Sequence, residues 1–313
     1  MQSRFKQLTE WLTSVCPYSS ITPLPRNASF RLYYRIETKK GRFIVLDAPP
    51  EKESCENFVL SAQHLLSHGL PVPQIIQSDL ELGFAVISDF GDYTLQGHSQ
   101  HYKQALDLLS SFRQCPPLCV GQYKAFDAAL IQWEFSQFEA WYLEKHLGCK
   151  LDDESSVLLK KIYGFLEKEI LDQPSVFMHR DYHSMNLMVR EDESIGILDF
   201  QDAMIGPVTY DLASLLRDCY VDLPHEQVRS LALYYKSLFD ETIEDDCFLR
   251  WFDLTGIQRH MKALFTFARK HWRDQQSEYL KYIPRTLAYI MAVSKTYPEL
   301  SFLTQLCEEK VTL

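Results

Sequence analysis

The sequence predicts an α+β protein of two lobes, in which a small antiparallel-sheet lobe with one main helix precedes a larger α-rich lobe. Three observations lead to this prediction. The chain has 313 residues, more than one simple core usually organises. Strand-like alternation dominates before about residue 96, and helical periodicity dominates after it. We therefore expect an N-terminal lobe at residues 1–95 and a C-terminal lobe at residues 96–313.

The first lobe contains short strands and two helices. An amphipathic helix is expected up to about residue 15. In SFRLYYRIET, apolar and polar side chains alternate as in a half-buried strand, and RFIVLDA after the KKG turn is its expected antiparallel partner. The prolines of DAPPEK end that strand. A helix over about residues 53–68 should end at Gly69, and VPQIIQ and FAVISDF are further strands.

The second lobe is expected to be mostly helical. Periodicity predicts helices at residues 100–113, 126–147 and 153–172, and again from residue 208 to the end. Only VFMHRDYHSMNLMV and IGILDF interrupt this pattern with strand-like apolar segments. The first of them carries several polar side chains in its middle, so it is the natural place to look for chemistry.

Composition excludes several classes of protein. The net charge of −10 and the pI of about 5.5 do not suit a protein that coats nucleic acid or an anionic membrane. No apolar run approaches the roughly 18 residues of a membrane span, and the N-terminus does not resemble a signal peptide. Eight scattered cysteines without a CxxC pair favour reduced thiols in a cytoplasmic protein. The sequence leaves the oligomeric state open.

The segment HRDYHSMN has residue types that suit phosphoryl transfer. Asp181 and Asn186 are five residues apart, and Asp199 follows the apolar strand IGILDF. Phosphoryl transfer needs an acceptor for the hydroxyl proton and oxygen ligands for Mg²⁺ on the ATP phosphates. A buried polar loop that only satisfies its own backbone is the alternative, but three ordered blocks favour chemistry. His183 is expected to be a satisfied neighbour rather than a base, and Arg180 to be part of the scaffold.

Three blocks together resemble a known family. HRDYHSMN, DFQDA and GPVTYDLASLLRD are similar to the aminoglycoside phosphotransferase branch of the protein-kinase-like fold. The resemblance implies a bilobal kinase-like fold that uses ATP and Mg²⁺. It also implies Asp181 as the catalytic-loop aspartate and Asn186 and Asp199 as magnesium ligands. Asp211 would then support the catalytic loop, and His179 would orient it.

The nucleotide side departs from the family pattern. The resemblance implies that RNASF covers the phosphates, with Asn27 and Ser29 as candidates, but no GxGxxG is present and an ordinary strand-entry turn is the alternative. The strand FIVLDAPPEK also lacks the usual lysine. Arg31 or Arg35 could replace it, because arginine binds phosphate through a bidentate fork. Glu56 is the candidate partner of that cation.

The segment VISDFGDYTL fits the connection between the two lobes. By the same resemblance, the backbone of Ser88, Asp89 and Phe90 is expected to hydrogen-bond the adenine edge of ATP. Ile87 is expected at the back of the base pocket.

The substrate is suggested by a basic helix. VLDAPPEKE, EAWYLEKHLG and GIQRHMKALFTFARKHWRDQQSEYLKYIPR resemble the bacterial anomeric sugar kinases of peptidoglycan recycling, which phosphorylate N-acetylmuramate and N-acetylglucosamine. Residues 258–285 contain seven Lys or Arg and two Asp or Glu, a balance that suits an anion such as the carboxylate of muramic acid. One helical arc collects polar residues, namely Arg259, Lys262, Thr266, Arg269 and Arg273. Arg259 and Arg273 are the candidate substrate residues, and a solvated outer helix face is the alternative.

Two other functions stay open on the sequence. The first is a kinase for aminoglycosides or for choline-like alcohols. Aminoglycosides are polycations, however, and suit a site with carboxylates better than a basic one. The second is a non-catalytic kinase-like binding module, favoured by the missing strand lysine and glycine-rich loop. The retention of Asp181, Asn186 and Asp199 argues against such a module.

Overall fold

A computed structural model of the chain describes residues 2–25, 30–118, 125–240 and 242–311. The chain forms two compact units. The N-terminal unit consists of Met1–Thr94 and Asn186–Asp202, and the C-terminal unit of Leu95–Met185 and Ala203–Leu313. The N-terminal unit therefore includes a second, later segment in addition to residues 1–94.

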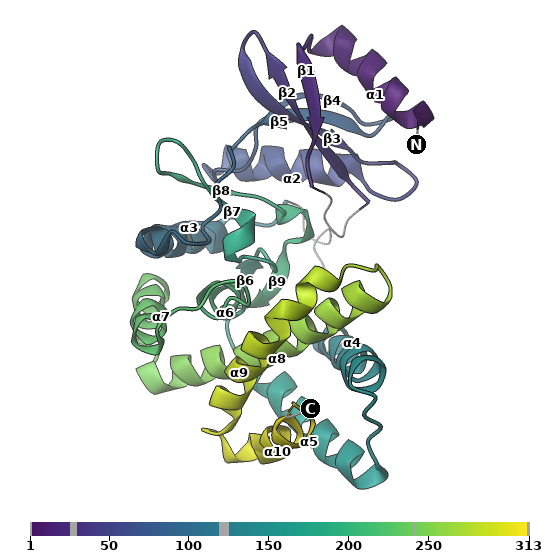
Figure 1. The fold of residues 1–313 in the computed structure, drawn as a ribbon. Helices are drawn as coiled ribbons and strands as arrows, with labels where there is room; N and C mark the ends of the chain where they lie inside the picture. The colour runs from purple at the N-terminus through teal and green to yellow at the C-terminus, as the bar shows by residue number, and fades with distance from the viewer. Residues whose placement is uncertain (1, 26–29, 119–124, 241, 312–313) are drawn as a thin grey trace. The chain divides into compact units, whose positions relative to one another are not determined.

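The N-terminal unit is built on a five-stranded antiparallel sheet of order β1-β2-β3-β5-β4 (Figure 1). Its strands are β1 (Ser20–Pro23), β2 (Leu32–Thr38), β3 (Gly41–Asp47), β4 (Ile75–Asp79) and β5 (Phe84–Ser88). The turn between β2 and β3 contains Gly41 with a φ of 117°, a conformation that favours glycine. The expected pairing of the segments around residues 30 and 45 is confirmed, with Tyr34 opposite Val45. The edge strand β1 was not expected.

Two helices pack in this unit. Helix α1 (Gln2–Val15) places Leu8 and Leu12 in one core cluster with Val45 and Phe84 of the sheet. The buried side of this amphipathic helix explains why it forms next to the sheet. Helix α2 (Cys55–Ser67) is capped by Ser54, whose hydroxyl accepts a hydrogen bond from the Asn57 amide. Gly69 follows the end of this helix with a φ of 76°. Both predicted helices are confirmed.

A short hairpin completes the N-terminal unit. Strand β7 (Leu187–Val189) pairs with β8 (Ile195–Ile197) in antiparallel register. The amide of Val189 donates to the Tyr93 carbonyl and that of Ile197 to the Pro71 carbonyl, both at 2.8 Å. These bonds connect the hairpin to residues far earlier in the chain.

The C-terminal unit is mostly helical, as predicted. Its main helices are α3 (Tyr102–Gln114), α4 (Ala128–Gln137), α5 (Asp153–Leu171), α6 (Tyr210–Leu216), α7 (His225–Phe239), α8 (Asp245–Trp272), α9 (Ile283–Ser294) and α10 (Ser301–Val311). A π-helical segment, η2 (Phe138–His146), continues α4. Helix α8 has 28 residues and packs against η2, α5, α6 and α9. It is the central element of the unit (Figure 1).

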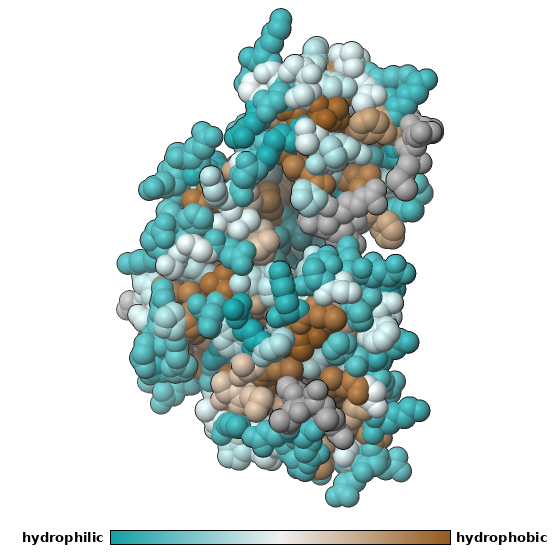
Figure 2. Space-filling view, viewed as in Figure 1, coloured by the Kyte–Doolittle hydropathy of each residue, from teal (hydrophilic) through white to brown (hydrophobic). Residues whose placement is uncertain are grey.

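A second strand pair lies in the C-terminal unit. Strand β6 (Ser175–Met178) pairs with β9 (Met204–Pro207), and the chain between them supplies both the polar loop after β6 and the β7–β8 hairpin. The face of the molecule in Figure 2 is largely hydrophilic, with hydrophobic residues in separate patches. In the described part of the chain, no helix has the length and apolar character to cross a bilayer.

Candidate active site

The polar loop after β6 is anchored at its start by Asp211. This residue lies in the first turn of α6, and its two carboxylate oxygens accept the backbone amides of His179 at 2.6 Å and Arg180 at 2.9 Å. Arg180 has a φ of 77°, an uncommon conformation for a side chain of this size. Burial raises the pKa of Asp211 to about 6, while His179 and the two amide bonds favour its charged form. Asp211 therefore fixes the bend that begins the loop.

The far end of the loop has its own anchor. The Asp218 carboxylate accepts the amide of Ser184 and the amide of Tyr220, both at 2.8 Å. Between the two anchors, the buried hydroxyl of Tyr182 donates to the Ala105 carbonyl at 2.8 Å. Three contacts thus hold a loop of a few residues, so its geometry is fixed before any ligand binds.

His179 is completely buried inside this loop. Its Nδ1 accepts the amide of Asp181 at 3.3 Å, and its ring contacts the rings of Phe112 and Tyr182, each with centroids 5.6 Å apart. The orienting role that the resemblance implies for His179 therefore has a direct contact to support it.

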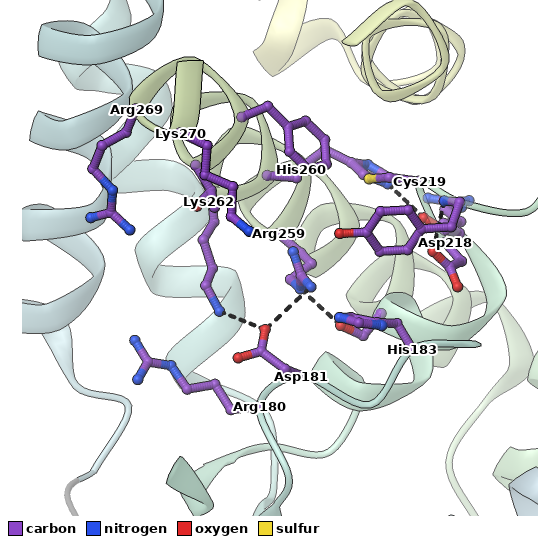
Figure 3. A pocket seen from close by; sticks show the side chains of 16 residues that line it. Arg180, Asp181, His183, Asp218, Cys219, Arg259, His260, Lys262, Arg269 and Lys270 are labelled. Atoms are coloured by element: carbon purple, nitrogen blue, oxygen red, sulfur yellow. Dashed lines mark hydrogen bonds and ion pairs between the residues drawn. The ribbon is translucent and has the colours of Figure 1, made fainter. Parts of the chain in front are cut away.

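Asp181 points into a pocket of about 290 Å³ beneath α8 (Figure 3). Lys262 Nζ lies 3.1 Å and an Arg259 guanidinium nitrogen 3.4 Å from the same carboxylate oxygen. Burial alone would raise the pKa of this carboxyl, but the charges of Lys262 and Arg259 outweigh it and hold the pKa of Asp181 far below its usual range. Asp181 is therefore ionised at every pH at which the protein would work.

The cations of the pocket outnumber its carboxylates. The basic side chains that line it are Arg180, Arg217, Arg259, Lys262, Arg269 and Lys270, and the acidic ones are Asp181 and Asp218. Asp218 is already bound to two backbone amides. Burial lowers the pKa of Lys262, with Asp181 opposing the effect. The pocket thus favours an anionic ligand.

His183 lines the pocket beside Asp181. Burial lowers the pKa of His183 to about 3, against the opposing effect of Asp181, so its ring is neutral at pH 7. A neutral ring of such low basicity is a poor general base. This supports the expectation that His183 is a neighbour of the chemistry and not its base.

The two residues expected to bind magnesium lie together in the N-terminal unit. Asn186 directly precedes β7 and Asp199 follows β8, and the Leu198 amide donates to the Asn186 carbonyl at 2.9 Å. The hairpin therefore brings both residues to its open end. Asp199 is exposed and has a φ of 58°, which Asp tolerates better than most residues. One amide and one carboxylate oxygen are donors that fit Mg²⁺.

The candidate phosphate residues are placed differently from expectation. Asn27 and Ser29 lie outside the described residues. The Arg31 side chain is 8% exposed and forms an ion pair with Glu53 at 3.2 Å. The expected partner Glu56 is instead exposed on the first turn of α2, so that pairing was wrong. Glu53 lies in the turn before the helix, from which it reaches Arg31 directly before β2.

Arg35 has other partners. Its guanidinium holds both oxygens of Asp89, the shorter contact being 2.6 Å, and also Asp92 at 2.5 Å. An arginine that is paired with two carboxylates is a weaker candidate for phosphate binding than an arginine that is paired with a single carboxylate. Of the two arginines weighed on the sequence, the structure favours Arg31.

The segment Ser88–Phe90 is already engaged in local contacts. The Ser88 amide donates to the Gln74 carbonyl at 3.0 Å, and the Ser88 hydroxyl accepts the Gln74 amide at 2.9 Å. Asp89 uses its carboxylate for Arg35. The Phe90 ring lies so close to Gly196 that a Cβ there would approach it to 2.4 Å. Adenine recognition by this backbone stays a prediction.

The two candidate substrate residues of the basic helix lie in different surroundings. Arg259 reaches Asp181 and also donates to the Ser214 hydroxyl at 2.8 Å. Arg273 follows the end of α8, is 54% exposed and forms an ion pair with Asp274 at 2.7 Å. It is not among the residues that line the pocket.

Sequence reasoning missed two contributors to the site. Lys262 was noted on the basic arc but not assigned to Asp181, although it lies three residues after Arg259 on the same helix face. Glu134 is 1% exposed and contacts Arg180 at 3.5 Å and the Gln258 amide at 2.5 Å. A lone glutamate in an apolar helix, QWEF, was the available signal.

Comparisons with known proteins cover most of the chain. A family model described as "Phosphotransferase enzyme family" matches residues 20–244. The N-acetylmuramate/N-acetylglucosamine kinase of Pseudomonas aeruginosa is 37% identical over 97% of this chain and 96% of that protein. The kinase of the same name from Neisseria meningitidis is 34% identical over 99% of this chain and 97% of that protein.

Solved structures show the same fold. An ethanolamine kinase of Plasmodium vivax has a TM-score of 0.66 at 14% identity and covers 91% of this chain and 87% of its own. Choline kinase LicA from Streptococcus pneumoniae has a TM-score of 0.65 at 15% identity, and the match covers 93% of this chain and 99% of that one. The predicted α+β, protein-kinase-like fold class and the predicted family are confirmed. The chain belongs to the phosphotransferase enzyme family.

Proposed function

We propose that this chain is an ATP-dependent sugar kinase that phosphorylates the anomeric hydroxyl of N-acetylmuramate and N-acetylglucosamine. The observation that carries the proposal is the ionised Asp181 held by Lys262 and Arg259 in a basic pocket. The names of the full-length relatives support the choice of sugar. Such a kinase would serve cell-wall recycling in the cytoplasm, where ATP is available and free thiols stay reduced.

Asp181 would bind the reacting hydroxyl of the sugar. Because its pKa is held far below the usual range, it is a weak base and remains a hydrogen-bond acceptor. This property suits phosphoryl transfer, in which a loose transition state needs the nucleophile to be aligned more than to be deprotonated early. The anchors at Asp211 and Asp218 hold the loop in position for this task.

Asn186 and Asp199 would hold Mg²⁺. A bound Mg²⁺ would supply positive charge that offsets the negative charge developing on the transferred phosphate. The two residues contribute oxygen donors from the open end of the β7–β8 hairpin. The fixed backbone at that end keeps these donors together.

Arg31 would bind an ATP phosphate in place of the missing strand lysine. Its ion pair with Glu53 and its low exposure keep the guanidinium oriented, as a phosphate-binding cation requires. The backbone of Asp89 and Phe90 remains the candidate for adenine.

A substrate panel tests the proposal. The protein is incubated with Mg²⁺–ATP and separately with N-acetylmuramate, N-acetylglucosamine, an aminoglycoside and choline, and products are followed by ³¹P NMR. We expect a sugar 1-phosphate from both amino sugars. Turnover of choline or the aminoglycoside alone would replace the proposed substrate.

Calorimetric titration with Mg²⁺–ATP addresses the binding-module alternative. An active kinase should bind the nucleotide with a dissociation constant below about 1 mM. The absence of nucleotide binding at millimolar concentration, together with no reaction of the four acceptors, would favour the binding module.

A further inference from the structure

Two basic side chains of the pocket lie against aromatic rings, and the acidic residue that acts on both is Asp274. The Arg269 guanidinium lies 5.6 Å from the centre of the Phe265 ring, and Lys270 Nζ lies 3.7 Å from that of Tyr279. Within the described ranges, neither side chain takes part in an ion pair. We call Arg269 and Lys270 the outer pair.

The other cations of the pocket have carboxylate partners. Their carboxylate partners are Glu134 for Arg180, Asp253 for Arg217, and Asp181 for both Arg259 and Lys262. The outer pair therefore carries the larger uncompensated positive charge: two charges, against the one left over where Arg259 and Lys262 share Asp181. An anion that enters the pocket gains most by approaching these two side chains.

Arg269 is also partly desolvated. Its Nε is buried and, among the described residues, has no hydrogen-bond partner. Burial lowers the pKa of Arg269, helped by Arg273 and opposed by Asp274. A guanidinium that loses water without gaining an acceptor carries an energetic cost, which a bound carboxylate would remove through charge-assisted hydrogen bonds.

The outer pair lies further along α8 than the two cations that contact Asp181. Arg269 follows Lys262 by seven residues on α8, which is two helical turns or about 10 Å along the axis on the same face. Side chains on a helix lean toward its N-terminus, so the Arg269 side chain tends back toward the inner pair, Arg259 and Lys262. Figure 3 shows Lys270 reaching into the pocket near Lys262. Arg269 lies on the opposite side of Lys262.

We propose that Arg269 and Lys270 form a subsite for a carboxylate carried by the sugar, at the end of the pocket away from the reacting hydroxyl. The inference rests on the proposed function. It assigns preference for an acidic amino sugar to the outer pair. The inner pair holds Asp181 and serves acidic and neutral sugars equally. N-acetylmuramate carries such a carboxylate, and N-acetylglucosamine does not.

Steady-state kinetics on both sugars test the subsite. We compare the wild type with Arg269→Gln, Lys270→Gln and the double variant. The double variant should raise KM for N-acetylmuramate at least about tenfold, because a charge-assisted contact is lost. The kcat/KM for N-acetylglucosamine should stay within about twofold. Lys281→Gln is the matched control, since Lys281 is exposed, lies 5.0 Å from the Tyr282 ring and is outside the pocket lining.

A neutral analogue gives a second readout. The lactyl amide of N-acetylmuramate has nearly the same size without the negative charge. The wild type should prefer the acid to the amide, and the double variant should lose that preference. A loss of kcat with both sugars would assign the outer pair to the phosphate instead. An unchanged KM for N-acetylmuramate would overturn the subsite while leaving the kinase intact. A wild type inactive on both sugars would overturn the proposed function and the subsite with it.

Discussion

The residue proposed to accept the hydroxyl proton and the residues proposed to bind magnesium are close in sequence, but different interactions act on them. Asp181 belongs to the C-terminal unit, where Lys262 and Arg259 compensate its charge. Asn186 and Asp199 belong to the N-terminal unit, where the β7–β8 register and backbone hydrogen bonds place them. The cations of α8 therefore set the charge state of Asp181, and backbone geometry sets the position of Asn186 and Asp199. Substitutions that change charge or backbone should affect the two groups differently.

The largest effect is expected at Asp181. Asp181→Asn keeps the shape of the side chain but removes the negative acceptor, and we expect kcat to fall by about 10³-fold or more. Stability should fall as well, because the substitution leaves the largely buried Lys262 and Arg259 without the carboxylate that compensates them. Initial rates and urea unfolding measure the two effects.

Asp192→Asn serves as the control for this substitution. Asp192 is 70% exposed in the turn of the β7–β8 hairpin and should leave the rate unchanged. If Asp181→Asn retained more than a tenth of the wild-type kcat, the assignment of the acceptor would be wrong.

The next largest effect is expected at Asp199. Asp199→Asn removes a charged metal ligand while keeping a residue that tolerates the observed φ of 58°. The rate at low Mg²⁺ should fall about 100-fold and recover in part at high Mg²⁺, because the loss is one of metal affinity. Titration of activity with Mg²⁺ measures this. Asp181→Asn should show no such recovery, and equal recovery in both variants would contradict the division between the two groups.

A smaller effect is expected at the anchor Asp211. Asp211→Asn retains one acceptor oxygen but faces the other backbone amide with an NH₂ group. We expect a loss of roughly 1–3 kcal/mol in the free energy of unfolding, the cost of one unsatisfied buried donor. The rate should fall about tenfold, through a less fixed loop. Urea unfolding and initial rates check both values, and a fully stable variant would show that the bend at Arg180 does not depend on this carboxylate.

The smallest effect concerns pH and the buried residue His260. Its Nε2 contacts the Arg217 carbonyl at 2.9 Å, and burial lowers its pKa to about 3, partly opposed by that bond. In the unfolded chain His260 takes up a proton near pH 6.5, whereas in the folded chain it stays neutral down to about pH 3. The contribution of His260 to the free energy of unfolding is therefore complete above pH 6.5 and is lost as the pH falls toward 3. His260→Gln should reduce the slope of unfolding free energy against pH by about 1.4 kcal/mol per unit between pH 6 and 4. An unchanged slope would mean that His260 is protonated in the folded state.

Candidates for the chemistry could be named from the sequence because phosphoryl transfer restricts both residue type and order, and their roles stay predictions. Asp181, Asn186 and Asp199 were identified from spacing and resemblance, and the polar arc of the basic helix already contained Lys262 and Arg269. An amphipathic pattern reports which side of a helix is polar. It does not report which polar residues face a pocket. That depends on where the helix lies in the unit.

Partner choice was harder to predict than residue type. Glu53 and not Glu56 reaches Arg31, because the turn before α2 brings the earlier residue to the strand. Arg273 belongs to the same arc as Arg269, but α8 ends beside it and Asp274 is adjacent to its guanidinium. Both outcomes depend on chain ends and turns, where periodicity carries no information.

An isotope experiment tests the central claim that the anomeric hydroxyl attacks phosphorus from its place beside Asp181. N-acetylglucosamine labelled with ¹⁸O at the anomeric position is converted with Mg²⁺–ATP, and the product is examined by ³¹P NMR. We predict a sugar 1-phosphate whose ³¹P signal shows the isotope shift of a bridging ¹⁸O, formed by the wild type and not by Asp181→Asn. A product phosphorylated at another hydroxyl, or a 1-phosphate without the label in its bridge, would contradict the account.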